Sequence, residues 1–499
     1  MNIKKTFIAI ALLGIFPLQS FADGGKVIYV APDGNDTASG SWDAPMATLP
    51  AAYEKMAGGD TVCFRGGTYK VTDEQVMKIE SLYAHTFALE KAGTKEGRTC
   101  FMGYPGERPV FDFSALQLDG AHRFTGFYLG ADYIHLRNFD IVGLPVRITG
   151  HTQSECVSAR KGSHCIVENI AMHHNMAIGY YQTKGSDNLV LNCDAYNNYD
   201  DYSEGTYGGN VDGFGIHVSK TYETGNRIIG CRAWRNSDDG YDLINCAAPV
   251  EISHCMAFFN GYQPAEDLTT FKSAGDGNGF KAGGWGMSAA VTKCPEVCPS
   301  HYVHHCLAYK NKANGFYSNH HMAGNTWEYN SASENRSNYE MKNRYANTAE
   351  GAYDVPGYNH VLRHNVSWKY RDKGHLTNYD TETCTMENNS FLPEDSAFTV
   401  MADMFVSTDV AGLFIKRNAD GTLPEIQFMR GREGSVPAKR QMGWCWEEAE
   451  CDTTLLKIPT YQEERLCDKT IFNLSGQQIP HPQKGVNIIG GRKVVVRYF

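Results

Sequence analysis

The sequence has no sustained run of apolar residues at helical spacing, and its acidic residues outnumber its basic ones, 56 to 46. The first absence argues against helical bundles and coiled coils, which need apolar residues at that spacing. The second argues against nucleic acid as a partner, because a protein with a formal net charge of −10 repels a polyanion. If the partner is an acidic polymer, a group such as a bound cation must reverse the local sign of the charge.

Apart from its N-terminus, the sequence also lacks any apolar run that could span a bilayer, which takes about 20 residues. Residues 1–22 carry Lys4 and Lys5, then an apolar run from Phe7 to Leu18, and end at Ala22. This order predicts a secretory signal peptide that is cut near Ala22. We therefore expect a secreted, periplasmic or cell-surface protein with no membrane span.

Cysteine does not follow the pattern of a disulfide framework or of a zinc site. The count of 15 is odd, the chain is too long to need cross-links, and no set of cysteine and histidine has zinc spacing. Cys294 with Cys298, or Cys445 with Cys451, are candidates for local disulfides. Four cysteines share one position of an internal repeat, which favours a buried stack of small apolar side chains: Cys193, Cys231, Cys255 and Cys306.

What the sequence does have is abundant glycine, with 50 residues, and an internal repeat of short strands that begins near Glu168. Its base period is roughly 24 residues and is longer in some copies, as in a solenoid with loops inserted on one face. The aligned small residues are Ala171, Ala195, Ala233, Ala257, Ala308, Ser333, Ser367 and Ser390. The column two positions earlier is Asn169, Cys193, Cys231, Cys255, Cys306, Ser331, Asn365 and Asn388. In four copies an asparagine suited to a bend with positive φ follows, namely Asn198, Asn236, Asn260 and Asn311.

This repeat predicts an all-β fold, a right-handed parallel β-helix over residues 23–400. Amides and thiols stacked in an interior column suit a coiled parallel sheet, and parallel crossovers are right-handed. The stretch from Val27 to Tyr69, with a short helix from Leu49 to Met56, is expected to cap one end of the stack. Residues 401–467 are expected to form an irregular segment packed on the helix, and residues 468–499 a small C-terminal β segment.

Three phrases of the repeat concentrate carboxylates and one lysine: Asn210-Val-Asp212-Gly-Phe214, Ser237-Asp238-Asp239-Gly-Tyr241-Asp242 and Gly277-Asn278-Gly-Phe280-Lys281. Alignment on the Gly-aromatic pair places Asp212 and Asp239 in one column, and Asp242 and Lys281 in a second. Residues in one column are neighbours about 4.8 Å apart, which is the strand spacing of a sheet. The alignment therefore predicts that the acids and the lysine share one wall.

The four aspartates, Asp212, Asp238, Asp239 and Asp242, suit calcium, which takes roughly six to eight oxygen ligands in flexible geometry. The alternative is that these acids only serve the turns that a β-helix needs at every corner. Asp212 and Asp239 fit this alternative, because asparagine holds their column in other copies. Asp238 and Asp242 do not, since the other copies have nothing acidic there.

Lys281 follows Asp242 by one turn in the same column. One interpretation is a surface salt bridge to Asp242, which would contribute little to stability. The other is a general base. A divalent cation nearby would lower the pKa of this lysine from its usual value of about 10.4, and the aspartates would raise it. We therefore expect an alkaline optimum if the lysine is a base.

The set Asp212, Ser237-Asp-Asp-Gly-Tyr-Asp242 and Gly279-Phe-Lys281, on a parallel β-helix with an N-terminal cap, resembles polysaccharide lyase family 9. Members of that family include pectate lyases and rhamnogalacturonan lyases, and the resemblance covers residues from about 27 to 430. It implies one calcium ion held by Asp212, Asp238, Asp239 and Asp242, with Lys281 as the base of a β-elimination. The implied substrate is a galacturonate-containing pectic backbone of the plant cell wall, either polygalacturonate or rhamnogalacturonan I.

Other side chains are candidate substrate contacts, although each could equally be ordinary surface or packing. Those that could bind carboxylates are Lys272, Arg232, Arg235 and Lys310, and those that could stack on sugar rings are Tyr317, Trp285 and Tyr241. Two other functions stay open. One is a glycoside hydrolase that uses paired aspartates on the same fold, and the other is a non-catalytic glycan-binding β-helix. We expect the protein to be a monomer.

Overall fold

The computed structural model describes residues 25–445, with gaps at 121, 150–152, 204–207, 209, 286–293, 348–350 and 393–397, and four strands between residues 471 and 496. The predicted signal peptide and Cys451 lie outside the described residues. None of the helices in these residues is both long enough and apolar enough to cross a membrane.

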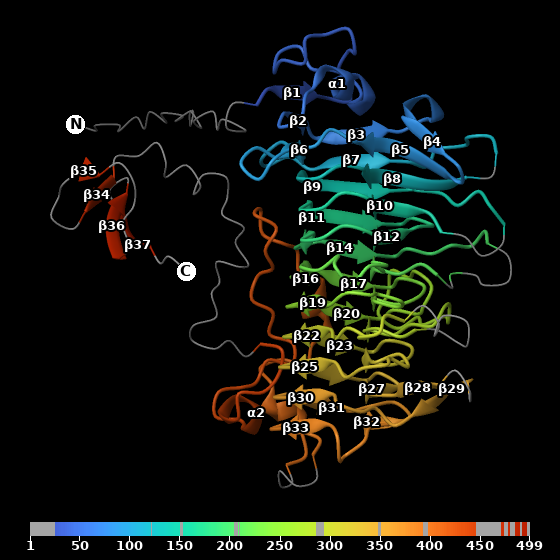
Figure 1. Cartoon of the computed structure of the whole chain (residues 1–499), viewed down its shortest axis with the longest axis vertical. Helices are drawn as coiled ribbons and strands as arrows, with labels where there is room; N and C mark the ends of the chain where they lie inside the picture. Colours follow the sequence, from blue (N-terminus) through green and yellow to red (C-terminus); the bar gives the residue numbers. More distant parts are fainter. Residues whose placement is uncertain are drawn as a thin grey trace, which may run out of the picture.

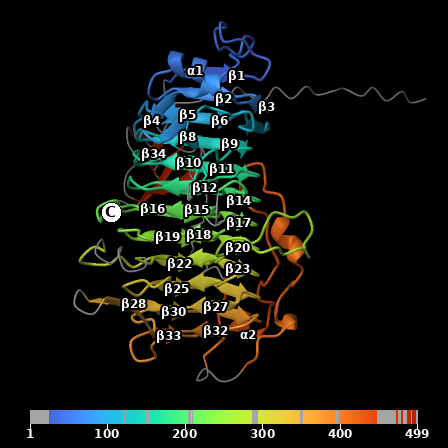
Figure 2. The same cartoon turned by 90° about the vertical axis from the view of Figure 1, so that its right-hand side faces the viewer.

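Most of the described chain is wound into a parallel β-helix, as the repeat predicts. Successive turns pair in parallel and give one sheet of 20 strands and another of 11 strands. Figure 1 shows these turns stacked along the long axis of the molecule, and Figure 2 shows the same stack from the side. The long apolar core of buried side chains runs through the whole stack, from Ile28 to Leu362.

The strands are short. The 11-stranded sheet contains β4 (Lys78–Glu80), β5 (Tyr83–Leu89), β8 (Arg123–Leu129), β10 (Glu155–Ala159), β12 (Ile178–Gln182), β15 (Phe214–Ile216), β18 (Tyr241–Asp242), β21 (Phe280–Lys281), β24 (Phe316–Tyr317), β27 (Ser337–Glu340) and β32 (Gly374–Thr377). The 20-stranded sheet contains β1 (Val27–Val30), β2 (Thr61–Phe64), β3 (Gly67–Lys70), β6 (Thr99–Gly103), β7 (Pro109–Asp112), β9 (Ile134–Val142), β11 (Ile166–His173), β13 (Leu189–Leu191), β14 (Asp194–Tyr196), β16 (Asn226–Ile229), β17 (Arg232–Trp234), β19 (Val250–Ser253), β20 (Met256–Phe258), β22 (Tyr302–His304), β23 (Leu307–Tyr309), β25 (Thr326–Glu328), β26 (Ser331–Ser333), β30 (Val361–Arg363), β31 (Val366–Trp368) and β33 (Thr385–Glu387).

A short helix lies at the N-terminal end of the stack. Helix α1 (Leu49–Lys55) begins after Thr48, whose side chain accepts a hydrogen bond from the Ala51 amide, and Pro50 occupies the first turn. Leu49 and Ala52 are buried, and the helix packs on β1 and β2 (Figure 1). An open end of a stacked fold would otherwise expose apolar surface, so this helix closes the core.

The cysteine column is a buried stack, as predicted. Cys193, Cys231, Cys255 and Cys306 are free thiols with no exposed surface. The amide of Cys193 donates to the sulfur of Cys231 at 3.3 Å, and the amide of Cys231 donates to that of Cys255 at 3.4 Å. Cys294 and Cys298 are free thiols in the structure, so neither of the two predicted disulfide pairs is confirmed.

The predicted register is wrong by one residue in three copies of the repeat. Ala195 pairs with Met172, not with Ala171, and Ala308 pairs with Ala332, not with Ser333. The column that contains the cysteines continues through Asn330 and Asn389, whose side chains accept the amides of Cys306 and Asn365. It does not contain Asn169, Ser331 or Asn388. In the last two of these copies adjacent residues are both small or both polar, as at Ala332 and Ser333 and at Asn388 and Asn389, so the sequence pattern alone fits either register.

The bend residues are also one position from those expected. The residues with positive φ are Asn197 (53°), Arg235 (51°), Phe259 (60°) and Lys310 (50°), each directly before one of the predicted asparagines. The asparagines themselves are buried and form a ladder through the core. The Asn198 amide nitrogen donates to Asn236 at 2.9 Å, Asn236 to Asn260 at 3.1 Å, and Asn260 to Asn311 at 3.0 Å.

This ladder makes a testable contribution to stability. Asn260 donates to Ala233 O at 3.0 Å and accepts from the Asn236 amide at 3.2 Å, so its removal leaves buried partners unpaired on both sides. We expect Asn260→Ala to lower the free energy of unfolding by about 3 kcal/mol, measured by urea denaturation. The exposed Asn418→Ala is the control and should change it by less than about 0.5 kcal/mol. A loss below about 1 kcal/mol in the ladder variant would contradict the assignment.

Residues 402–442 lie along the 20-stranded sheet (Figure 1). They contain η3 (Ala402–Met404), η4 (Val410–Phe414) and α2 (Val436–Lys439). Their buried side chains pack on an outward row of the sheet: Trp234, Phe258, Tyr309 and Trp368 contact a cluster that includes Phe405, Leu413, Ile426, Phe428 and Met442. Arg417 adds an ion pair to Asp194 at 2.7 Å. This face of the solenoid is therefore covered and leaves the 11-stranded sheet as the face for a site.

Two small antiparallel units complete the described strands. Strand β28 (Asn343–Asn347) pairs with β29 (Gly351–Val355) as a hairpin. Strands β34 (Ile471–Asn473), β35 (Gln478–Ile479), β36 (Gly485–Ile489) and β37 (Arg492–Val496) form a four-stranded antiparallel sheet.

Candidate active site

The three phrases lie on consecutive strands of the 11-stranded sheet. Their aromatic residues point into the core and stack, with ring centroids 5.2 Å apart for Phe214 and Tyr241 and 4.6 Å apart for Tyr241 and Phe280. The next residue on each strand points outward, since side chains alternate along a strand. This outward column runs Tyr181, Gly215, Asp242, Lys281, Tyr317, Glu340 and Thr377 in strict register. We call it the outer column.

A second row of polar residues lies at the corner before these strands. The Asp239 amide donates to Asp212 Oδ1 at 3.0 Å, and the Asn278 amide donates to Asp239 Oδ1 at 2.6 Å. The Asn314 amide continues the row by donating to Asn278 at 3.2 Å. Asp212 and Asp239 thus serve the corner in the same way as the asparagines, and the side chain of Asp238 has no place in this row.

Three of the four aspartates form a compact group. Asp212, Asp238 and Asp239 are buried, and one carboxylate oxygen of each lies within 4.8 Å of the others. Asp238 Oδ1 accepts a hydrogen bond from the Asp276 amide at 2.6 Å. Asp239 Oδ2 is buried, and its ion-pair partner is Lys281 Nζ at 3.0 Å. Asp242 lies beside this group on the same wall: its Oδ1 accepts from the Ile244 amide at 2.7 Å, and its Oδ2, like that of Asp239, faces Lys281.

The carboxylates repel one another. Burial, followed by repulsion from the neighbouring aspartates, raises the pKa of Asp212 well above its usual value. The same two causes raise the pKa of Asp238. Burial also raises the pKa of Asp239, against the opposing effect of Lys281. Hard oxygen donors packed close together, with more negative charge than one lysine balances, fit Ca²⁺, which prefers carboxylate ligands.

Lys281 is the cation that faces this group. Its Nζ lies 3.0 Å from Asp239 Oδ2 and 3.1 Å from Asp242 Oδ2, and its side chain is only 10% exposed. Burial alone would lower the pKa of Lys281, but attraction to the surrounding aspartates outweighs it and raises the pKa well above its usual value. The ammonium is therefore held at a fixed point on the wall, so the pair is not a flexible surface salt bridge.

A cleft of about 1070 Å³ opens over these groups. Its lining includes Asp212, Asp238, Asp242 and Lys281, and also two further lysines, Lys272 and Lys312. An extended polymer could therefore lie across the outer column and reach the lysine from solvent.

Two aromatic side chains of the cleft were not predicted from the sequence. His217 and Tyr181 lie beside Asp242, with their rings 4.9 Å apart. His217 Nε2 is buried with no hydrogen-bond partner among the described residues, and burial lowers the pKa of this imidazole. Gly215 gives them room, because a Cβ there would meet His217 Nε2 and Tyr181 Cδ2, both at 3.1 Å. Gly215, which places no side chain in the outer column, was the sequence signal from which these two residues could have been predicted.

Several predicted substrate contacts are wrong. Arg232 is buried and donates to Asp194 at 2.7 Å, and Arg235 is buried and donates to the carbonyl of Thr270 at 3.0 Å. Lys310 lies over the ring of Phe271 at 4.4 Å, away from the cleft lining. Tyr241 and Trp285 are buried, so neither can stack on a sugar. Lys272 lines the cleft, and Tyr317 lies one strand beyond Lys281 in the outer column.

Comparison with known proteins gives concordant matches. A family model described as "Pel9A-like, right handed beta helix region" matches residues 28–354. Pectate lyase L of Dickeya dadantii is 32% identical over 408 residues, 81% of this chain and 83% of that protein. Among solved structures, a rhamnogalacturonan lyase has a TM-score of 0.78 and 40% identity, covering 84% of this chain and 100% of that one. Pectate lyase Pel9A has a TM-score of 0.62 and 29% identity, covering 83% of this chain and 91% of that one.

The region that matches the family model contains all four aspartates and Lys281. It spans well over half of the chain and ends within the β28–β29 hairpin. The chain therefore belongs to the Pel9A-like right-handed β-helix family, polysaccharide lyase family 9, and is a polysaccharide lyase.

Proposed function

We propose that this enzyme cleaves the galacturonate-containing backbone of pectin by β-elimination, with Ca²⁺ as cofactor and Lys281 as general base. The observation that carries the proposal is the position of Lys281. Its Nζ is fixed between Asp239 and Asp242, beside a compact group of three aspartates and on the wall of an open cleft. The relatives support the substrate class, since they are named pectate lyases and a rhamnogalacturonan lyase. Export through the predicted signal peptide belongs to the same proposal.

Asp212, Asp238 and Asp239 would hold the cation together with Asp242, the fourth predicted ligand, whose negative charge acts on the same cluster and raises the pKa of Asp212. When bound, Ca²⁺ would draw electron density from the substrate carboxylate and so acidify the proton at C5. The bound cation would supply the positive charge by which an acidic protein can accept an acidic polymer at this point.

Lys281 takes the C5 proton in this scheme. The proton moves from C5 to Nζ, and the electron pair of the C5–H bond forms the C4–C5 double bond. The bond from C4 to the glycosidic oxygen breaks with its electron pair on that oxygen, which takes up a proton from solvent. No water is consumed. The two carboxylates on either side of Nζ hold the ammonium at one position. A cation bound beside it would oppose their effect and lower the pKa of Lys281, which favours the neutral, proton-accepting amine.

An ultraviolet assay tests the reaction class. Elimination leaves an unsaturated, absorbing chain end, whereas hydrolysis leaves none. We expect absorbance and new reducing ends to appear together when the protein acts on polygalacturonate or on rhamnogalacturonan I with calcium. New reducing ends without absorbance would show a glycoside hydrolase, and binding without any fall in polymer length would show a glycan-binding protein. Either of these results overturns the proposal.

A further inference from the structure

A second pocket lies further along the outer column. It has a volume of about 430 Å³, and we call it the basic pocket; its walls include Tyr317, Arg336, Glu340, Lys342, Lys373 and Thr377. Lys281 pairs in register with Tyr317, Tyr317 with Glu340, and Glu340 with Thr377. Glu340 therefore lies two strands from Lys281, roughly 10 Å along the stack. A pyranose unit in an extended chain is about as long as one strand spacing, so the pocket is within reach of the same polymer.

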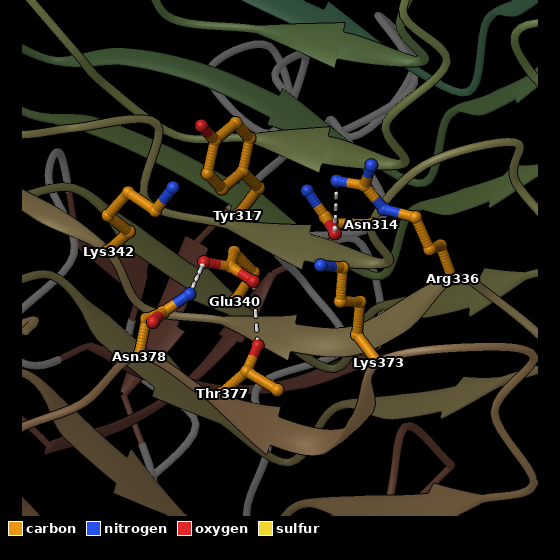
Figure 3. A pocket seen from close by; sticks show the side chains of 8 residues that line it. All are labelled: Asn314, Tyr317, Arg336, Glu340, Lys342, Lys373, Thr377 and Asn378. Carbon is orange, nitrogen blue, oxygen red and sulfur yellow. Dashed lines mark hydrogen bonds between the residues drawn. The ribbon is translucent and has the colours of Figure 1, made fainter.

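The charge of the basic pocket is opposite to that of the aspartate cluster. Three basic side chains line it, and Glu340 is the one acid in its lining. Figure 3 shows Glu340 at the centre, with Arg336 and Lys373 on one side and Lys342 on the other. In a chain of formal net charge −10 this is a local excess of positive charge. Such an excess attracts an anion directly and needs no metal ion.

The basic side chains have little else to bind. Among the described residues the ammonium of Lys373 has no ion pair, and Arg336 reaches only Asn314 Oδ1, at a long 3.4 Å. Lys342 lies 3.7 Å from Asp354, a half-exposed carboxylate that also accepts Arg344 at 2.9 Å. Their charges are therefore available to a ligand.

Glu340 is fixed, in contrast. It is buried, accepts a hydrogen bond from Thr377 Oγ1 at 2.7 Å, and accepts a second from the amide of Asn378 (Figure 3). A rigid carboxylate beside three cations is suited to accept hydroxyl hydrogen bonds from a ligand whose own carboxylate meets the cations. A hexuronate unit has both groups on one ring.

We propose that the basic pocket is a subsite for the carboxylate of a second hexuronate unit, about two sugar units from the bond that is broken. This inference rests on the proposed function, because it assumes that a polyuronate lies along the outer column. Both candidate polymers have carboxylates at the spacing that this subsite requires. Polygalacturonate has a carboxylate on every unit, and rhamnogalacturonan I has one on every second unit, so both place one in the basic pocket when another is at Lys281.

The test is the kinetics of Arg336→Gln/Lys373→Gln in the full chain with calcium. We expect KM to rise by about tenfold on polygalacturonate or on rhamnogalacturonan I, with kcat within about threefold of wild type, since a charge-assisted contact is lost without change at the reacting atoms. Lys373→Arg, which keeps the charge, should retain a KM within about twofold of wild type. Lys416→Gln, an exposed lysine on the opposite sheet's covering segment, is the control and should behave as wild type.

The outcomes separate the two proposals. If wild type produces no unsaturated ends from either polymer, the proposed function fails, and this inference fails with it. If wild type is active and the double variant keeps its KM within about twofold on both polymers, the subsite alone is refuted. A rise in KM on one polymer supports the subsite and identifies that polymer as the source of the carboxylate.

Discussion

Replacement of Lys281 by arginine should lower kcat for elimination at least about a thousandfold, within the range that a positioned general base contributes. Arginine keeps a positive charge beside Asp239 and Asp242 but stays protonated at any accessible pH, so it cannot accept the C5 proton. The variant therefore separates the role of a base from that of a counter-charge. Lys281→Ala should lose as much activity. The measurement is the initial rate of absorbance at saturating substrate and calcium.

The pH dependence is a second readout for this lysine. The surrounding aspartates raise the pKa of Lys281, so its neutral, proton-accepting form increases as pH rises. The wild-type rate should therefore rise with pH on the alkaline side of neutrality, and this rise should be absent from the residual rate of Lys281→Arg.

Lys272→Ala, at an exposed lysine of the same cleft, is the matched control and should change kcat by less than about threefold. More than a tenth of the wild-type kcat in Lys281→Arg would exclude the lysine as the base.

Much of the fold could be predicted because the core of a β-helix repeats chemically as well as geometrically. The columns of Cys193, Cys231 and Cys255, and of Ala195, Ala233 and Ala257, are read directly from the sequence and pair as expected. The register failed where neighbours were similar, as at Ala332 and Ser333. There the choice depends on which side chain accepts the preceding turn's amide in the core, and composition does not contain that information.

The candidate site, like the fold, could be predicted from the sequence only in part. The outer column, with Asp242 beside Lys281, was predictable because the Gly-aromatic pair fixes the inward stack and therefore the outward residue. Arg232 was misjudged because its partners come from distant parts of the chain: it donates to Asp194 and to the carbonyl of Ile415. An arginine in the repeat can form its ion pair and hydrogen bonds with another part of the protein as readily as with a substrate. Only the packing of residues 402–442 on the sheet shows which of the two it contacts.

The metal role of Asp242 stays a prediction. Sequence and resemblance placed Asp242 with the other aspartates, and in the structure its Oδ2 lies 3.1 Å from Lys281 Nζ while its Oδ1 accepts from the Ile244 amide. Spacing gives the strand on which a carboxylate lies but not which neighbour its two oxygens face. Asp238 is thus the more informative position for calcium, since it has no part in the corner row and is within the compact group.

Asp238→Asn should weaken calcium binding by at least about tenfold, or about 1.4 kcal/mol. Asparagine keeps an acceptor for the Asp276 amide, so the fold around it is preserved, while one charge of the group is lost. In wild type, calcium at a hundred times its Kd should stabilise the fold by about 2.7 kcal/mol, visible as a rise in Tm. The same calcium concentration should raise the Tm of Asp238→Asn by much less. With excess chelator, wild-type activity should fall below about a hundredth.

The control for this pair of measurements is Asp201→Asn, an exposed acid that lines the same cleft outside the compact group. It should keep the calcium-dependent rise in Tm and the wild-type rate. If the aspartates only served the corners, calcium would not raise the Tm of any of the three proteins, and full activity would remain in chelator. In that case the repulsion among the buried carboxylates would have to be relieved by protonation instead of by a cation.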